Sequence, residues 1–329
     1  MTRTLVRLSH SDAKRENILF VSWTLGNVCN YQCSYCPADL HDGSRPWIPL
    51  RNIIAFSERL VDIARERGKT VCIQLSSGEI TLMPEFLNLT AHLKELGCEL
   101  VVISNGSKPI QWWREAVESL DQVVLSFHPE RADLHHFSEV ANVASSKIRT
   151  HLNVAAPPSH FEKALGAAEH LAANCTDVTI LLKPMLVDFK DRLYPYTDTQ
   201  LAMFRDRKFV ARTTRPVVSI RGTMLAQYSD GQTQAVEPAQ FIVSDLNHWQ
   251  GWECSAGLEL ISIKFSGEIY RAVCGEGGPI GNIYFPRRFS LPLSPVVCTR
   301  KSCTCLLDIM MTRRSRNGHL GSDVSAPQK

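Results

Sequence analysis

The stretch LFVSWTLGNVCNYQCSYCPADLHDG, residues 19–43, decides the fold of this chain. Its first seven residues are rich in strand-forming types and predict a buried β-strand. Cys29, Cys33 and Cys36 follow directly, in a C-x₃-C-x₂-C spacing. Three thiolates within eight residues can surround one face of a metal cluster, and such soft ligands suit an iron–sulfur cluster or zinc. A closed Cys₃His zinc site with His41 as its fourth ligand is the alternative.

Outward from this stretch, the sequence alternates strands with helices. We expect six strands, at residues 19–25, 69–77, 99–105, 122–128, 147–156 and 177–186. The amphipathic segments between them predict helices at residues 49–68, 84–97, 109–120, 135–146 and 160–174. This alternation predicts an α/β fold with a parallel sheet or a partial (β/α)₆ barrel. The working residues of such folds lie on loops at the carboxyl ends of the strands.

The chain is expected to divide into five parts. Residues 1–18 form an N-terminal extension, residues 19–190 the barrel, and residues 191–239 a connecting segment with one helix near 199–207. Residues 240–311 form a small cysteine-rich α+β module, which begins with a hairpin that turns at Ser266–Gly267. Residues 312–329, rich in Ser, Gly and Arg, predict a disordered tail whose arginines are solvated.

The strand ends resemble those of the radical S-adenosylmethionine (radical SAM) superfamily. The three cysteines have that family's spacing, with an aromatic residue, Tyr35, before the third. SSGEITLMPEF after the second strand is similar to the family's Gly-Gly-Glu motif, with Ser77 in place of the first glycine. ISNGS at the third strand end and LSFHPE at the fourth are also similar to family motifs. The resemblance covers about residues 17–190.

The resemblance implies a [4Fe–4S] cluster on Cys29, Cys33 and Cys36 whose open iron binds S-adenosylmethionine. One electron then cleaves this cofactor to a 5′-deoxyadenosyl radical, which abstracts a hydrogen atom from the substrate, so the cofactors carry the difficult chemistry. The resemblance also implies further cofactor contacts: Ser77, Gly78 and Glu79 at the methionine ammonium, Tyr35 near the adenine, and Ser104, Asn105 and Ser126 at the ribose or carboxylate.

Five cysteines in the C-terminal module form a second group: Cys254, Cys274, Cys298, Cys303 and Cys305. The phrases WECSAG, SGEIYRAVCG and PIGNIY resemble the SPASM and twitch modules, which hold auxiliary clusters. Five cysteines are too few for two fully ligated clusters, so we expect one auxiliary [4Fe–4S] cluster, with Cys254, Cys274, Cys303 and Cys305 as preferred ligands. Cys298 is then left over and is a candidate hydrogen-atom donor. A zinc ribbon is the alternative for this module.

Three further side chains at the strand ends are candidate catalytic residues that contact substrate or exchange a proton: His128, Glu130 and Lys183. Cys72, Cys98 and Cys175 stand singly and are expected in the core.

The composition narrows the class of protein. The 329 residues carry 36 basic and 33 acidic side chains, a net charge of +3, which does not indicate a nucleic-acid-binding face. We find no secretory signal and no apolar run long enough to span a membrane. We therefore expect a cytoplasmic, reduced protein whose eleven cysteines bind metal or pack in the core.

These observations favour a radical SAM oxidoreductase or epimerase that acts on a small polar molecule, such as a sugar, aminocyclitol or natural-product intermediate. An electron donor such as flavodoxin or ferredoxin is the expected partner. A maturase that crosslinks or epimerises a ribosomal peptide is the second hypothesis. A non-catalytic zinc-binding protein is the third.

Overall fold

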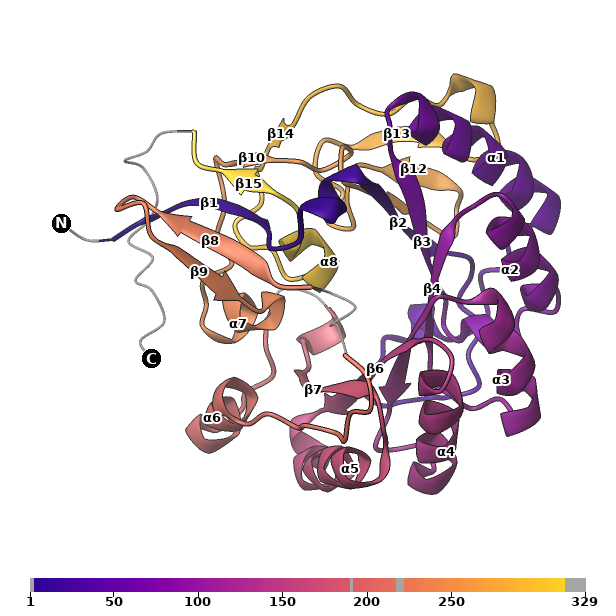
Figure 1. Ribbon diagram of the computed structural model, residues 1–329, viewed down its shortest axis with the longest axis vertical. Coiled ribbons are helices and arrows are strands. Elements are labelled where there is room, and N and C mark those ends of the chain that lie inside the picture. Colours follow the sequence, from indigo (N-terminus) through magenta and orange to yellow (C-terminus); the bar gives the residue numbers. More distant parts are fainter. Residues whose placement is uncertain (1–2, 190–191, 217–221, 317–329) are drawn as a thin grey trace.

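The computed structural model describes residues 3–189, 192–216 and 222–316. Six parallel strands run through it in chain order and form a curved sheet with helices on its outer side (Figure 1). They are β2 (Ile18–Thr24), β3 (Thr70–Ser76), β4 (Glu99–Ser104), β5 (Gln122–Phe127), β6 (Arg149–Ala156) and β7 (Val178–Pro184). The partial barrel predicted from the sequence is confirmed, and each strand end lies within two residues of its expected position.

The expected helices cover the outer face of this sheet. They are α1 (Leu50–Glu66), α2 (Phe86–Glu95), α3 (Ile110–Ala116), α4 (Leu134–Ser145) and α5 (Phe161–Asn174). Helix α1 begins after Pro49 and is followed by Gly68, whose φ of 65° is the left-handed conformation that ends helices. Asp133 caps α4, because its carboxylate accepts a hydrogen bond from the His136 amide at 2.7 Å. The helices bury apolar faces against the sheet, and the strand ends stay free for a site.

The C-terminal hairpin extends the barrel sheet. Strand β11 (Leu260–Ile263) pairs in parallel with β2, and β12 (Glu268–Tyr270) and β13 (Pro279–Asn282) follow in antiparallel pairing. The predicted hairpin turn is confirmed at Gly267, which has a φ of 82°. The cysteine-rich module is thus joined to the edge of the barrel through backbone hydrogen bonds.

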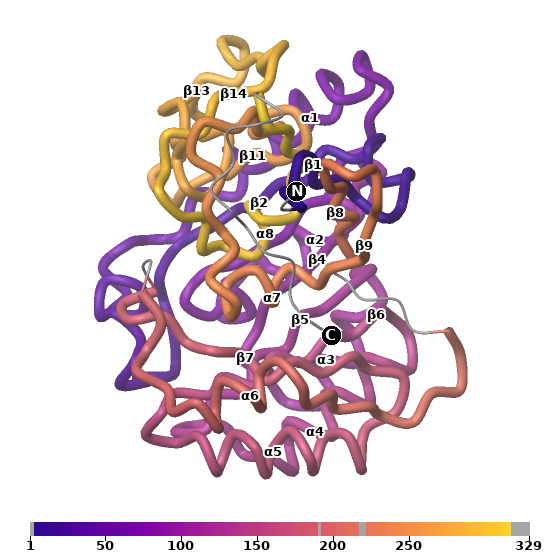
Figure 2. Tube along the Cα trace, turned by 90° about the vertical axis from the view of Figure 1, so that its left-hand side faces the viewer, coloured from indigo at the N-terminus to yellow at the C-terminus, as the bar shows by residue number. Residues whose placement is uncertain are grey.

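A second, smaller sheet connects distant parts of the chain. Its strand order is β14 (Val296–Val297), β10 (Glu253–Cys254), β15 (Arg313–Arg314), β1 (Leu5–His10), β8 (Met224–Tyr228) and β9 (Thr233–Val236). Figure 2 shows the C-terminal strands of this sheet, in orange and yellow, beside β1 at the indigo start of the chain. Among the described residues of the second half of the chain, the α-helices are α6 (Asp198–Asp206), α7 (Pro238–Val243) and α8 (Leu306–Ile309).

Both ends of the chain differ from the sequence-based expectation. Part of the predicted N-terminal extension forms β1, and Arg313, expected in a solvated tail, is only 2% exposed. Neither short segment has a periodic pattern of its own. Each is ordered by distant partners: β1 pairs with β8 and β15, and β15 pairs with β1 and β10, all antiparallel. Residues 317–329 of the predicted disordered tail lie outside the described residues.

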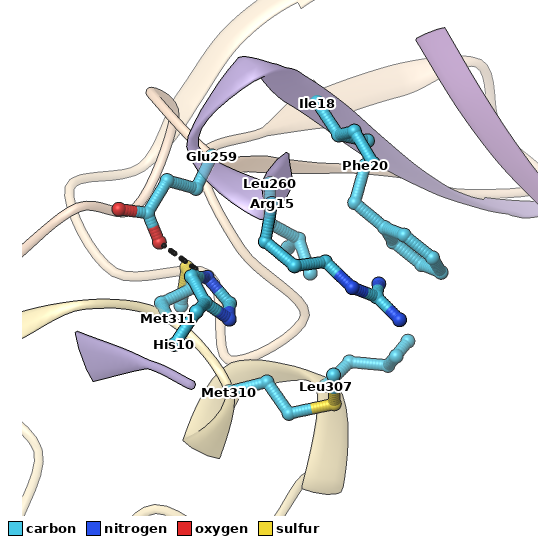
Figure 3. A pocket seen from close by; sticks show the side chains of 9 residues that line it. All are labelled: His10, Arg15, Ile18, Phe20, Glu259, Leu260, Leu307, Met310 and Met311. Atoms are coloured by element: carbon cyan, nitrogen blue, oxygen red, sulfur yellow. Dashed lines mark hydrogen bonds and ion pairs between the residues drawn. The ribbon is translucent and has the colours of Figure 1, made fainter. Parts of the chain in front are cut away.

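A partly buried hydrogen bond between His10 and Glu259 joins the N-terminal strand to the C-terminal module. His10 Nε2 lies 3.2 Å from Glu259 Oε2, beside a cavity of about 30 Å³ lined by Phe20, Met310 and Met311 (Figure 3). The Glu259 carboxylate also accepts a hydrogen bond from the Thr312 amide at 2.8 Å. This contact holds the module against the start of β2.

Candidate functional site

Cys29, Cys33 and Cys36 lie in the loop that follows β2. The Tyr31 amide donates a hydrogen bond to Cys29 Sγ at 3.3 Å, and the Cys36 amide donates to the Cys33 carbonyl at 3.0 Å. Burial raises the pKa of the Cys33 thiol to about 11 and that of Cys36 to about 12. Thiols in such surroundings stay protonated unless a metal replaces the proton.

The loop after β3 packs directly on the start of the cysteine loop. A Cβ atom at Gly78 would lie 2.6 Å from the Val28 carbonyl oxygen and 2.8 Å from that of Asn27. The Glu79 amide donates a hydrogen bond to the same Val28 carbonyl at 2.7 Å. Only glycine allows this approach, so the two loops hold each other in place.

The Glu79 carboxylate joins the ends of β3 and β4. It is 1% exposed and accepts hydrogen bonds from the Asn105 amide at 2.6 Å, Ser104 Oγ at 2.8 Å and Thr81 Oγ1 at 2.7 Å. Burial raises the pKa of Glu79, although these hydrogen bonds oppose the rise. Its oxygens are therefore engaged within the protein, and the side chain positions the loop.

These loops surround a cavity of about 400 Å³ at the carboxyl ends of the strands. Ser77 Oγ and His41 Nδ1 are buried and have no hydrogen-bond partner in the described part of the chain. Asn105 Nδ2 donates to Asn30 Oδ1 at 2.9 Å and so ties the end of β4 to the cysteine loop. Of the residues predicted from the sequence, the cavity wall contains Cys29, Cys33, Cys36, Ser77, Gly78, Glu79, Ser104, Asn105, Ser126 and His128.

The segment after β5 holds the cysteine loop from the opposite side. Glu130 accepts hydrogen bonds from the Ser34 amide at 2.8 Å and from Ser34 Oγ at 2.5 Å. His128 Nδ1 shares a hydrogen bond with Tyr35 Oη at 2.8 Å, and the two rings stack. Burial, and then the charge of Lys183, lowers the pKa of His128 to about 4, so this imidazole is neutral at pH 7. Tyr35 packs beneath the loop and is not part of the cavity wall.

A second cavity of about 630 Å³ adjoins the first, because both are lined by Ser76, Ile103 and Phe189. It extends from the barrel interior to the C-terminal module. Lys183, at the end of β7, lies on its wall, and so do Cys274 and Cys305 from the module. Lys183 thus lines the second cavity and is still near enough to act electrostatically on His128 in the wall of the first.

The five C-terminal cysteines come from four separate segments. Cys254 is on β10, Cys274 follows β12, Cys298 follows β14, and Cys303 and Cys305 precede α8. Cys254 and Cys303 are buried and the other three are half-buried. Cys298 is not part of the wall of the second cavity, whereas Cys305 is.

Two charged side chains organise this group. Asp308, which is fully buried, accepts hydrogen bonds from the Val273 and Cys274 amides at 3.0 and 2.7 Å. Arg313 donates to Cys303 Sγ at 3.4 Å. Burial alone would lower the pKa of Arg313, but the nearby Cys303 and Cys254 sulfurs, and then the Asp308 carboxylate, raise it.

Within the described residues, no three His, Cys, Asp or Glu side chains converge closely enough to hold a single metal ion. A [4Fe–4S] cluster does not need such convergence, because each thiolate binds a different iron. Both cysteine groups therefore have the donor type that a cluster needs.

Sequence reasoning missed several residues of the first cavity wall. Tyr31 lies inside the cysteine motif, but spacing alone does not indicate which way its ring points. Lys264 and Phe265 come from the C-terminal hairpin, and they reach the cavity because β11 pairs with β2. No local signal could have found them. The three single cysteines, by contrast, are confirmed in the core, at 2% exposure or less.

Comparison with known proteins identifies the class that this fold and site define. Residues 23–183 match the family model described as the Radical SAM superfamily. These residues, just under half of the chain, form a radical SAM domain.

Individual relatives are distant. The GTP 3′,8-cyclase of Pectobacterium atrosepticum is 26% identical over 128 residues, which cover 34% of this chain and 37% of the relative. The match thus spans little more than a third of the curated relative's length. The solved structure described as "Native anSMEcpe with bound AdoMet" is 14% identical with a TM-score of 0.50, and the match covers 81% of this chain and 78% of that one. This likeness supports the fold.

Streptococcus suis SuiB is also similar, at 14% identity and a TM-score of 0.45 over 82% of this chain and 65% of that one.

No helix in the described parts of the chain is long and apolar enough to cross a membrane.

Proposed function

We propose that this protein binds S-adenosylmethionine in the first cavity and uses it to oxidise or epimerise a small polar substrate bound in the second. One observation carries the proposal. A single cavity is lined by the three cysteines of the C-x₃-C-x₂-C motif and by the ends of β3, β4 and β5. The cysteine loop and these strand ends are spread over more than 100 residues of sequence. A zinc site on the cysteine loop alone would not require the strand ends to meet at one cavity.

The residues present fit the cofactor. When bound, a [4Fe–4S] cluster with three protein thiolates leaves one iron open and supplies the electron that cleaves S-adenosylmethionine. The unpartnered Ser77 Oγ can accept a hydrogen bond from an ammonium group that approaches over Gly78. Asn105 and Ser126 offer further polar groups on the same wall.

The second cavity supports a substrate of modest size. Its volume of about 630 Å³ lies within the range of ordinary small-molecule sites. Lys183 supplies a positive charge there, Asp308 adds a carboxyl group whose oxygens are bound to the 273–274 amides, and Gln74, Ser302 and Thr304 supply neutral polar groups. This lining suits a polyhydroxylated or anionic molecule. The name of the curated relative, a GTP cyclase, also indicates a small-molecule substrate for that protein.

The C-terminal cysteines would hold an auxiliary cluster beside this cavity. Cys274 and Cys305 are on the wall of the same cavity as Lys183, so a cluster bound by four of the five thiols would lie close to the substrate. Such a cluster could accept an electron from the substrate and complete a two-electron oxidation. The sequence favours Cys303 and Cys305 as the last two ligands, with Cys298 as a hydrogen-atom donor. The surroundings of Arg313, described below, favour Cys298 as a ligand instead.

The test is an anaerobic assay of the iron-loaded chain with S-adenosylmethionine, a reductant such as reduced flavodoxin, and panels of polar small molecules and short peptides. A true substrate should increase the release of 5′-deoxyadenosine. A product lighter by two hydrogens indicates oxidation, and deuterium taken up from solvent indicates epimerisation. Turnover of peptides alone would support the maturase hypothesis. Bound zinc without iron, together with no 5′-deoxyadenosine, would refute the proposal.

A further inference from the structure

Arg313 is an unusual residue in the C-terminal module. Its side chain is 2% exposed, whereas its neighbour on β15, Arg314, is exposed. Removal of a guanidinium from water is costly unless an opposite charge or a full set of hydrogen bonds compensates. The partners of Arg313 therefore indicate what the site is built to hold.

The hydrogen-bond acceptors around Arg313 are mostly neutral. Its guanidinium donates to the carbonyl oxygens of Asp308, Ile309 and Met311, and it lies 4.4 Å from the centre of the Trp249 ring. In the described part of the chain, no carboxylate forms a hydrogen bond or an ion pair with it. The Asp308 carboxylate is directed to the amides of the 273–274 segment. The charge of Asp308 acts on the guanidinium electrostatically, but burial raises the pKa of this carboxyl group and so disfavours its charged form.

Cysteine sulfurs are the other potential negative groups beside the guanidinium, and one of them contacts it directly. Arg313 Nη2 is 3.4 Å from Cys303 Sγ, and Cys254 and Cys298 are near enough to act electrostatically on the guanidinium. Cys254 lies on β10, the strand paired with β15, and β14, which precedes Cys298, pairs with the other edge of β10. A metal-bound cysteine is a thiolate and carries the negative charge that a buried cation needs.

We propose that Arg313 is the buried counter-charge of a metal cluster held by Cys254, Cys274, Cys298 and Cys303, and that Cys305, on the wall of the second cavity, is not one of its ligands. The inference rests on the proposed function, since it requires a cluster in this module. Cys274 completes the set because Asp308 fixes its amide and it lies within electrostatic range of Cys254 as well as of Cys303. Cys305 also lies within range of Cys303, so the Cys305→Ser variant tests its exclusion. Arg313 is thus a positioning residue that also favours the reduced, more negative form of the cluster.

The experiment uses the full-length chain with Cys29, Cys33 and Cys36 changed to Ala, so that only the C-terminal cluster is observed. Arg313→Met, Arg313→Lys and the control Arg314→Met are compared in this background. The readouts are iron and sulfide per chain, the midpoint potential followed by electron paramagnetic resonance, and the rise in unfolding temperature on iron loading. Cys298→Ser and Cys305→Ser test the ligand set.

The parent and Arg314→Met should hold about four irons, as one [4Fe–4S] cluster requires. Arg313→Met should lose at least half of this iron or shift the midpoint potential to more negative values, and Arg313→Lys should recover most of the difference. Iron loading should stabilise the parent more than Arg313→Met. Cys298→Ser should lose the cluster, whereas Cys305→Ser should keep it.

Unchanged iron content and potential in Arg313→Met would overturn the inference. Loss of folding in both Arg313→Met and Arg313→Lys would also overturn it, because Arg313 would then serve only the backbone carbonyls. If Arg313→Met alone fails to fold, Cys298→Ser and Cys305→Ser decide whether the proposed ligand set is correct. A cluster that is kept in Cys298→Ser and lost in Cys305→Ser contradicts this set. A parent without iron would instead refute the auxiliary cluster of the proposed function.

Discussion

Replacement of Gly78 with alanine tests whether the contact between two loops forms the cofactor cavity. The added Cβ would lie 2.6 Å from the Val28 carbonyl oxygen, and ordinary contact at 3.4 Å requires the loops to separate by about 0.8 Å. Overpacking of this kind costs about 1–3 kcal/mol. Loss of the 2.7 Å hydrogen bond from the Glu79 amide to Val28 adds about 1 kcal/mol.

The total cost of about 2–4 kcal/mol arises in two loops that form the wall of the first cavity. Because 1.4 kcal/mol corresponds to about tenfold in affinity, binding of S-adenosylmethionine should weaken by at least tenfold. The assay is equilibrium dialysis of S-adenosylmethionine against the iron-loaded chain, with thermal unfolding in parallel. Gly166→Ala is the matched control: Gly166 lies inside α5 with nothing within 4 Å of its added Cβ, and alanine there should stabilise by about 0.5–1 kcal/mol. Equal affinity in Gly78→Ala and the parent would refute the reasoning.

Two other substitutions test the supports of the site. Glu130→Gln weakens the charge-assisted hydrogen bonds from Ser34 by about 1–2 kcal/mol. A chelator should therefore remove iron from the first site of Glu130→Gln at least fivefold faster than from the same site of the control Glu118→Gln, whose substituted side chain is exposed. Equal rates of iron loss in the two variants would contradict this role of Glu130. Glu259→Gln should lower stability by about 1–3 kcal/mol in thermal unfolding, because Glu259 accepts hydrogen bonds from His10 and the Thr312 amide. Burial opposes ionisation of Glu259, but these hydrogen bonds outweigh it and lower the pKa of Glu259 overall. The parent should therefore be more stable than the variant at neutral pH, and this difference in stability should shrink only as the pH falls below 4.5, the ordinary pKa of a glutamate. An advantage that instead grows at low pH would contradict this sign.

The barrel could be predicted from the sequence because its signals are local. Each strand is a short apolar run followed by a polar turn, and each helix has its own period and end signals. The strand-end residues from Ser77 to Ser126 meet at one cavity because the carboxyl ends of parallel strands share one edge.

The C-terminal half was harder to predict because its order depends on distant partners. Strands β1 and β15 are separated by about 300 residues, and nothing local indicates their pairing. Arg313 stands in a run of arginines, which predicts a solvated tail because such runs are usually exposed. Its burial depends on Trp249 and on carbonyls and a sulfur of the 303–311 segment. The sequence does not indicate the direction of a side chain either. The hydrogen bonds of Glu79 and Glu130 to neighbouring loops are therefore evident only from the structure.

The central claim is that the first cavity binds and cleaves S-adenosylmethionine. The most direct measurement is the amount of 5′-deoxyadenosine formed when the iron-loaded chain is reduced with dithionite in the presence of S-adenosylmethionine. We predict formation by the parent and none by the variant in which Cys29, Cys33 and Cys36 are alanine, with both chains folded by circular dichroism. No 5′-deoxyadenosine from an iron-loaded parent, or equal amounts from both chains, would contradict the claim.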